Sequence, residues 1–342
     1  MSTTEPSLGA RRAAWRTALK EAVLWPTQRI CDPHHHLWGH PDDEYFAAEL
    51  AADIGDGHHV LNTVYVECEW AYRADGPVAM ASVGETEFVV AQDEILTAQH
   101  GHSVIVGIIA LADLRLGAAV RPVLEAHRAA GRGRFCGVRH AVAWDASPEI
   151  FNHHLEPPPD LLLDPQFVAG VRTLGEQQLC FDVWAFHNQL SQVTELARRA
   201  PGTTIVLDHL GAPLGVGPYA GRRQEVLAHC RTELQAFAAL PNARLKLGGI
   251  GMTTYGNGWH KQPQAPSSND LVARWGDFIR WCIDCFGPAR VMFESNFPPD
   301  RRSCSYRTLW NAYKKMAAPY HQAERDLMFC DTALATYRLP GG

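Results

Sequence analysis

The residues best suited to chemistry lie together near the start of the chain, in the segment Asp32-Pro33-His34-His35-His36-Leu37-Trp38. This segment follows the apolar pair Ile30-Cys31, a pattern that predicts the end of a short buried strand. Because alternate residues of a strand point to the same side, we expect Asp32, His34 and His36 to share one face. Two imidazoles with this spacing can bind one metal ion or together hold one anionic oxygen. The alternative is a histidine-rich turn with no catalytic or binding role, in which the side chains only pack against their neighbours.

Polar, mostly ionisable side chains also stand at the ends of later apolar, strand-like runs. Seven of eight such runs end in this way. The residues concerned are His34, His36, Glu67, Asp113, Arg139, His140, His187, Asp208, His209, Glu294 and Asn296. In the remaining run, Lys246 comes just before two glycines. One histidine after a strand carries little information, but histidines after the first, fifth and sixth runs together indicate a shared site.

The elements that must position these residues follow a regular order. The first run ends at the histidine segment, and the other seven cover residues 60–66, 104–110, 135–138, 179–186, 203–207, 244–247 and 290–293. Between most of them lies room for one helix, which predicts a parallel α/β fold. The count of eight favours a distorted (β/α)8 TIM barrel with long βα loops, in which the carboxyl ends of the strands meet at one mouth. An open, doubly wound sheet is the main alternative, although no glycine-rich phosphate loop occurs in a strand–turn–helix context.

The chain of 342 residues divides into two predicted parts. Residues 1–29 form an N-terminal arm, in which Trp15, Leu19 and Val23 have helical spacing and predict an amphipathic helix over residues 11–25. Residues 30–340 form the barrel domain. The basic, alanine-rich start also resembles a weak transit peptide, against which its acidic residues argue. The segment 253–268, rich in Gly, Pro, Ser and Asn, is predicted to be a mobile lid.

Composition limits the partners. With 31 basic and 37 acidic residues the formal net charge is -6, so nothing suggests a nucleic-acid surface. The longest strongly apolar run, residues 104–111, is strand-sized and does not predict a membrane span. The nine cysteines are scattered and odd in number, which fits a reducing cytoplasm, and we read Cys282 and Cys285 as helix packing. We therefore expect a cytoplasmic protein with a small-molecule substrate, and leave a homo-oligomer open.

Four blocks resemble the amidohydrolase-2 (amidohydrolase-related) branch of the amidohydrolase superfamily. They are residues 32–38, 186–190, 207–213 and 292–298, and the tail 306–313 is similar to the same group. Within the branch, the sequence is most similar to the sugar-lactone and 2-pyrone-4,6-dicarboxylate lactonase group. The resemblance covers about residues 30–338 and implies a distorted TIM barrel with its site at the strand ends.

The same resemblance implies the roles of four histidines. His34 and His36 are the first-strand pair, His187 is the fifth-strand histidine and His209 the sixth-strand one. A metal would be held by His34, His36 and His187. Proteins of this kind use one divalent metal, often zinc, or no metal, in which case the histidines and an arginine orient the substrate.

The sequence departs from the family pattern after the eighth strand. The usual Ser-Asp-x-Pro, whose aspartate is metal ligand and general base, is here Ser295-Asn296-Phe297-Pro298. A neutral amide cannot take a proton from water and is a weak ligand. Either the metal is loosely bound or absent, or another carboxylate substitutes, and the candidates are Glu294, Asp300, Asp208 and Glu67. For Glu294, a buried ion pair with Lys246 or Arg139 is the alternative without catalysis.

We therefore predict a hydrolase that acts on a lactone or other cyclic ester of a small carboxylated substrate. Arg139 would clamp the substrate carboxylate, His209 would hold the developing oxyanion, and Asp300 or Glu294 would activate water. The residues expected to line the pocket are Glu67, Trp70, Tyr72, Trp144 and Trp259. Two alternatives stay open. One is a metal-dependent non-oxidative decarboxylase of the same superfamily, and the other is a ligand-binding barrel without catalysis, which only Asn296 favours.

Overall fold

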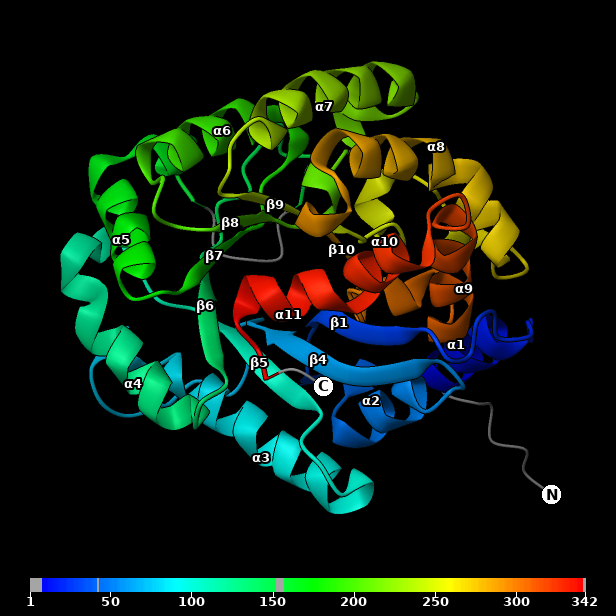
Figure 1. The fold of residues 1–342 in the computed structure, drawn as a ribbon, viewed down its shortest axis with the longest axis horizontal. Coiled ribbons are helices and arrows are strands. Elements are labelled where there is room, and N and C mark those ends of the chain that lie inside the picture. The colour runs from blue at the N-terminus through cyan, green and yellow to red at the C-terminus, as the bar shows by residue number, and fades with distance from the viewer. Residues whose placement is uncertain (1–7, 42, 152–156, 341–342) are drawn as a thin grey trace.

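A single parallel sheet of eight strands forms the centre of the molecule (Figure 1). The structure, a computed structural model, describes residues 8–41, 43–151 and 157–340. The strands pair in the order β1-β4-β5-β6-β7-β8-β9-β10. Their bounds are β1 Arg29–His35, β4 His59–Val66, β5 Ile105–Ala110, β6 Phe135–Arg139, β7 Cys180–Val183, β8 Ile205–Leu207, β9 Ala243–Leu247 and β10 Val291–Phe293. The predicted (β/α)8 barrel is confirmed, and the open sheet is excluded.

The barrel closes where β1 meets the segment that follows β10. There the Asn296 amide donates to the His34 carbonyl at 2.9 Å, and the His36 amide donates to the Phe297 carbonyl at 2.8 Å. These bonds replace a regular β1–β10 ladder and make a nearly closed ring. They also place the histidine segment directly beside Asn296.

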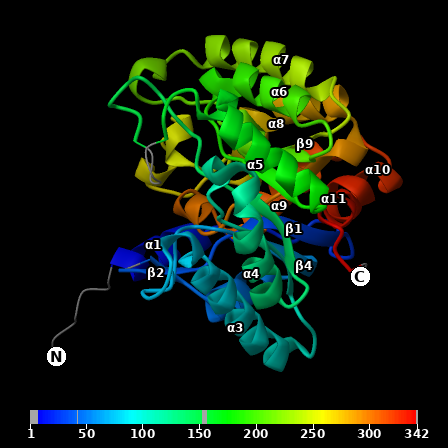
Figure 2. The same ribbon diagram turned by 90° about the vertical axis from the view of Figure 1, so that its left-hand side faces the viewer.

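Helices surround the strands on the outside, as the predicted alternation requires (Figures 1 and 2). Their bounds are α1 Leu8–Thr17, α2 Ala47–Ile54, α3 Val83–His100, α4 Arg121–Gly131, α5 Pro165–Glu176, α6 Leu190–Arg199, α7 Arg223–Ala238, α8 Ser268–Phe286, α9 Tyr306–Met316, α10 Gln322–Asp326 and α11 Thr332–Tyr337. Helix α4 begins only at Arg121, because Gly117 has a φ of 57° that interrupts the preceding 3-10 segment. In the arm, α1 ends at Thr17, so Leu19 and Val23 lie beyond the helix.

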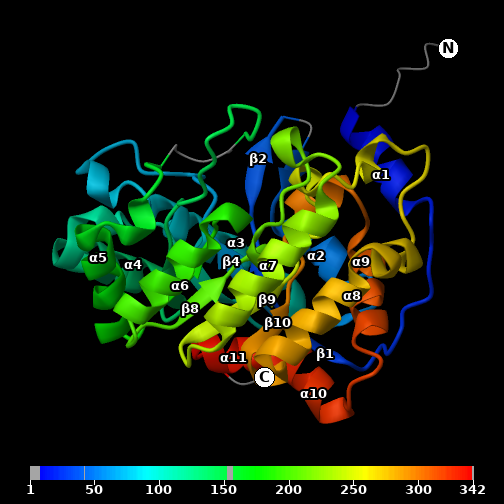
Figure 3. The same ribbon diagram turned by 90° about the horizontal axis from the view of Figure 1, so that it is seen from above.

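The two ends of the barrel differ in what covers them. A two-stranded hairpin, β2 Trp38–His40 and β3 Asp43–Tyr45, lies with α1 at the end where β1 finishes, and α11 lies across the other end (Figure 3). The sequence did not predict this hairpin. The lid segment 253–268 contains only short 3-10 turns, and its Gln262 carbonyl accepts a hydrogen bond from the Trp15 indole at 3.0 Å. None of the helices in the described ranges is long and apolar enough to cross a membrane.

The barrel interior changes from apolar to ionised along the strands. Beside α11 it is filled by an apolar group: Cys31, Val64, Val66, Ile109, Cys136, Cys180, Val206, Met292, Cys330, Ala333 and Tyr337. On three strands a fully buried carboxylate comes two residues after a member of this group and points to the same side of the strand. These carboxylates are Asp182 after Cys180, Asp208 after Val206, and Glu294 after Met292. The apolar layer thus forms a dry floor beneath a layer of charge. All nine cysteines are free thiols.

Asp32 does not share a face with His34, contrary to the expectation from alternation. The register between β1 and β4 shifts between Asp32 and His35, which is a β-bulge and breaks the period of two. The Asp32 carboxylate instead accepts hydrogen bonds from the Ser295 amide at 2.9 Å and the Tyr306 hydroxyl at 3.0 Å. Burial raises the pKa of Asp32 to about 6. Its contacts therefore tie β1 to the segments after β10.

Candidate active site

The imidazole of His34 lies at the centre of a fully buried cluster. Its Nε2 is 3.2 Å from Nε2 of His36 and 3.4 Å from Nη1 of Arg139. Its Nδ1 is 3.1 Å from Nζ of Lys246 and 3.0 Å from Oε2 of Glu294. These side chains come from β1, β6, β9 and the segment after β10, so only the closed barrel brings them together.

His209, after β8, joins the cluster through Glu294. Its Nδ1 is 2.6 Å from Oε1 of Glu294, and its ring centroid is 4.4 Å from that of His34. The backbone at His209 has a φ of 55°, a left-handed conformation that turns the chain sharply at the strand end. Because a carboxylate can only accept, Nδ1 of His209 donates to Glu294, which fixes the orientation of the ring.

Four carboxylates and two cations make up the charge of the cluster. Arg139 donates from Nε to Oε1 of Glu67 at 2.7 Å and also bonds the Glu67 carbonyl, while its Nη1 lies 3.5 Å from Asp208. Lys246 lies 2.6 Å from Asp182 and 3.1 Å from Asp208. Instead of the expected pair with Lys246 or Arg139, Glu294 contacts two histidines: Oε2 lies 3.0 Å from Nδ1 of His34 and Oε1 lies 2.6 Å from Nδ1 of His209.

The surroundings set the protonation of these groups. Burial, followed by the nearby Lys246 charge, lowers the pKa of His34 to about 4, and burial lowers that of His36 well below its usual value. Burial alone would raise the pKa of Glu294, but His209 and His34 outweigh it and lower that pKa to about 2. The pKa of Asp208 is likewise held well below its usual range, because Lys246 and His34 outweigh burial. At neutral pH the site therefore combines neutral His34 and His36 with ionised Glu294 and Asp208.

Asn296 and Asp300 form a pair under the lid. The Asn296 side-chain amide donates to Oδ1 of Asp300 at 2.9 Å, and the Gly251 amide donates to Oδ2 at 2.7 Å. Both Asp300 oxygens are thus engaged by protein groups, and burial raises its pKa well above the usual value. The pair fixes the orientation of the Asn296 amide and holds Gly251, two residues before the segment 253–268.

His187 lies apart from this convergence. Its ring packs edge-on against Tyr219 at 4.6 Å, and its Nδ1 accepts the Leu214 amide at 3.5 Å. Burial, followed by the His229 charge, lowers the pKa of His187 to about 4. Its ligand atoms are not among those that converge with His34 within the described residues.

The three predicted tryptophans are partly buried on the loops beyond the strand ends. Trp70 stands 5.4 Å from the His40 ring, the Trp144 amide donates to the Gln189 side chain at 2.9 Å, and Trp259 begins a turn of the lid. Two aromatic neighbours of the cluster were not predicted. Trp38 stacks on His36 with centroids 5.7 Å apart, and Trp184 packs edge-on against His209 at 5.1 Å.

Asp182 and Tyr337 were also not predicted as part of this region. The Tyr337 hydroxyl, from α11, donates to Oδ2 of Asp182 at 2.8 Å, the same oxygen that Lys246 contacts. Strand alternation was the available signal: Asp182 stands two residues before Trp184 in an otherwise apolar run, so the two side chains should point to the same side of the strand. No sequence signal relates Tyr337 to it.

The residues fit a divalent metal. One ligand atom from each of His34, Asp208 and His209 can be chosen so that all lie within 4.8 Å of one another. The 3.2 Å between Nε2 of His34 and His36 is also close to the roughly 3.3 Å that separates two nitrogens on one tetrahedral zinc ion. Several buried carboxylate oxygens among the described residues lack a hydrogen bond: Glu67 Oε2, Asp182 Oδ1, both of Asp208, and Glu294 Oε2. Nitrogen and oxygen donors with surplus negative charge suit zinc.

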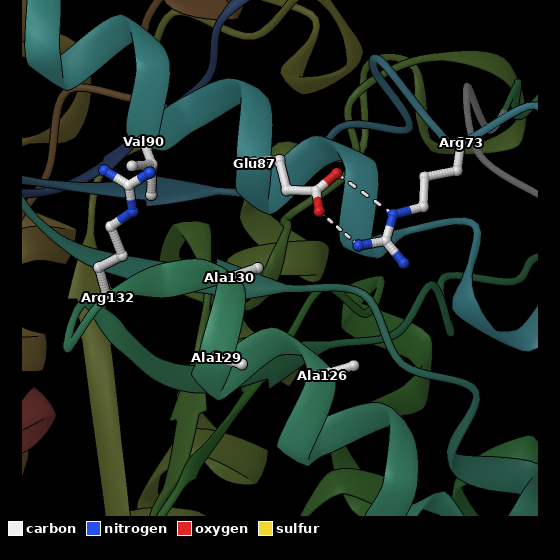
Figure 4. A pocket seen from close by; sticks show the side chains of 7 residues that line it. All are labelled: Arg73, Glu87, Val90, Ala126, Ala129, Ala130 and Arg132. Carbon is white, nitrogen blue, oxygen red and sulfur yellow. Dashed lines mark hydrogen bonds and ion pairs between the residues drawn. The ribbon is translucent and has the colours of Figure 1, made fainter.

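A surface hollow of about 410 Å³ lies elsewhere, between α3 and α4 (Figure 4). Arg73 and Arg132 stand on its rim, and Arg73 is paired with Glu87 across it. Its floor is made of alanines. It contains none of the cluster residues, so it is separate from the candidate active site.

A profile described as Amidohydrolase matches residues 31–339. The chain belongs to the amidohydrolase family. This amidohydrolase is 27% identical over 314 residues to the L-fucono-1,5-lactonase of Burkholderia multivorans, covering 90% of this chain and 96% of that protein. It is 25% identical over 327 residues to an uncharacterised protein of Sinorhizobium fredii, covering 91% and 98% of the two chains.

A solved structure has the same fold. It is an amidohydrolase from Burkholderia multivorans with bound zinc, at a TM-score of 0.69 and 23% identity, covering 91% of this chain and 99% of the other. At this identity the match concerns the fold. The family assignment and the lactonase relative together make the protein an enzyme of the amidohydrolase superfamily, as the sequence predicted.

Proposed function

We propose that this amidohydrolase opens a lactone or other cyclic ester of a small carboxylated substrate by hydrolysis. The observation that carries the proposal is the convergence of neutral His34, ionised Asp208 and His209 in one buried cluster at the strand ends. The similarity to a protein named L-fucono-1,5-lactonase supports a cyclic sugar ester as the substrate class.

His34, Asp208 and His209 would hold one divalent metal, for which zinc is the best match to the donors. When bound, a metal of this kind polarises an ester carbonyl and lowers the pKa of an attacking water. Glu294 accepts a hydrogen bond from Nδ1 of His209 and so orients this ligand. His36 presents its Nε2 beside His34, because its Nδ1 donates to the Val66 carbonyl at 2.8 Å.

Asp208 takes the proton from water in this proposal, in the place of the aspartate that Asn296 replaces. Its two oxygens face the cations Lys246 at 3.1 Å and Arg139 at 3.5 Å within the cluster, whereas the oxygens of Asp300 accept hydrogen bonds from Asn296 and Gly251. We therefore assign Asp300 to the support of Asn296 rather than to catalysis. Asn296 itself offers a neutral carbonyl that can accept a hydrogen bond from a substrate hydroxyl.

Arg139 stabilises negative charge at the reacting carbonyl in the proposal. Its Nε is engaged by Glu67, while Nη1 points to His34 and Asp208. A clamp on the substrate carboxylate, as predicted from the sequence, would have to compete with Glu67 for the guanidinium. Trp70, Trp144 and Trp259 stay proposals for substrate contact from the surrounding loops. His187, predicted as a metal ligand, is not needed for the site proposed here and stays a prediction.

The substitution Asp208→Asn tests the assignment. Because general-base catalysis contributes about 10²–10⁴-fold, we expect kcat on a panel of sugar lactones to fall by about that factor. Asp93→Asn is the matched control, since Asp93 is also fully buried and ion-paired, but with Arg134 outside the cluster. It should keep kcat.

Two results would contradict the proposal. Carbon dioxide release from aryl carboxylates, with no turnover of any lactone, would indicate the decarboxylase reaction instead. Calorimetry that detects tight lactone binding while the ligand is recovered unchanged would indicate a binding protein.

A further inference from the structure

Lys246 is the least expected member of the cluster, because an ammonium group is fully buried in the centre of a candidate metal site. Its Nζ lies 2.6 Å from Oδ2 of Asp182, 3.1 Å from Oδ1 of Asp208 and 3.1 Å from Nδ1 of His34. A lysine ammonium has three donors and no acceptor. The three contacts therefore use its full capacity.

Lys246 and Arg139 approach the two ring nitrogens of His34. Lys246 Nζ lies 3.1 Å from Nδ1 and Arg139 Nη1 lies 3.4 Å from Nε2, and both groups can only donate. Oε2 of Glu294 lies 3.0 Å from Nδ1, on the same side of the ring as Lys246. The His34 ring therefore lies between two cations of the protein itself.

The Lys246 ammonium contacts two residues that a metal would need. Asp208 and His34 are two of the three residues whose ligand atoms converge, and both contact the ammonium. A divalent cation bound to them would lie close to a fixed positive charge, which repels it.

We propose that Lys246 is a resident counter-cation of the site, a positioning residue that holds His34 and Asp208 in a metal-independent arrangement and weakens their affinity for a divalent metal. This inference rests on the metal site of the proposed function, but not on the lactonase reaction. Asp182 and Tyr337 contribute to the same arrangement. The Tyr337 hydroxyl donates to Oδ2 of Asp182, and the same oxygen binds the Lys246 ammonium. Helix α11 thereby supports the site from the barrel floor.

The test compares the metal affinity of wild-type protein, Lys246→Met and Lys246→Arg, by titrating zinc and manganese ions against a chelating competitor. We expect Lys246→Met to bind metal at least tenfold more tightly, because a competing charge is lost. Lys246→Arg should return the affinity toward the wild-type value. Lys314→Met is the matched control: Lys314 is also fully buried and also contacts a histidine, with Nζ 2.8 Å from Nδ1 of His58 and 2.8 Å from the Leu24 carbonyl.

Unchanged or weaker metal binding by folded Lys246→Met would overturn the inference, as would an equal gain in Lys314→Met. Should Lys246→Met fail to fold, Lys246→Gln provides the second variant, because its amide keeps a donor beside the carboxylates but carries no charge. It should also bind metal more tightly than the wild-type protein, and unchanged or weaker binding would overturn the inference. Neither measurement uses lactone turnover, so a failed lactonase assay leaves the result readable.

Discussion

Asn296 occupies the position at which the family pattern has an aspartate. In the structure its side-chain amide is paired with Asp300. The amide donates to one Asp300 oxygen while the Gly251 amide donates to the other. An aspartate at position 296 would have no donor for Asp300. The local network therefore depends on the amide, and position 296 cannot be read as a simple loss of a base.

Asn296→Asp should consequently lower stability in a pH-dependent way. Two buried carboxyl groups about 3 Å apart can share one proton but cannot both ionise cheaply. The folded state then holds its proton more tightly than the unfolded chain, so stability falls as pH rises. We expect a loss of about 2 kcal/mol at pH 8 and less at pH 5.5, measured by urea unfolding.

The swapped variant Asn296→Asp with Asp300→Asn provides the control. It restores one donor and one acceptor at the two positions, so most of the lost stability should return. A double variant no more stable than Asn296→Asp at pH 8 would show that the pair is not the cause.

At the scale of elements, the strand-end residues were predictable because each strand is an apolar run with a clear end. His34, His36, Arg139, Asp208 and His209 do meet in one cluster. Parity failed where the β-bulge after Asp32 intervenes, since a bulge leaves no mark in the hydrophobic pattern. Asp182, which lies inside a strand, was missed because its partners come from other elements, and Lys246 was noted but paired with Glu294 rather than with Asp182 and Asp208.

Helices α3 and α4 are joined by a buried histidine that should respond to pH. His127 lies 2.8 Å from the Thr86 hydroxyl and 2.9 Å from the Leu111 carbonyl, and burial lowers its pKa to about 4. In the unfolded chain this pKa is near 6.5, so only the unfolded state takes up a proton between pH 6.5 and 4. The contribution of His127 to stability is therefore present above pH 6.5 and lost as the pH falls.

His127→Gln isolates this effect. The difference in unfolding free energy between wild type and variant should shrink by about 3 kcal/mol between pH 7.5 and pH 4. Denaturant unfolding at several pH values measures it. A difference that stays constant across this range would contradict the assigned protonation.

At the scale of the whole molecule, the floor of the barrel is tied to the charged layer above it. Tyr337 lies on α11 and reaches Asp182 on β7, and the two residues stand 155 positions apart. A contact of this kind cannot be predicted from one sequence, because neither residue belongs to a local pattern. The eight strands, by contrast, were predicted from local runs alone.

Tyr337→Phe should lower the unfolding free energy by about 2 kcal/mol, because a buried carboxylate loses a hydroxyl donor. Tyr313→Phe is the matched control: Tyr313 is also fully buried, but its hydroxyl has no hydrogen-bond partner among the described residues. Urea unfolding of both variants gives the comparison. An equal loss in the two would mean that packing, rather than the hydrogen bond, matters.

The seam that closes the barrel joins segments far apart in the chain: the Ser295 hydroxyl donates to the His34 carbonyl across 261 positions. Contacts of such long range form slowly, since the intervening loop must first be brought together. During refolding, the histidines of the first strand should therefore contact the segment after β10 only in the final kinetic phase. A stopped-flow experiment that follows a zinc-binding dye should record the recovery of metal capture later than the recovery of helical circular dichroism.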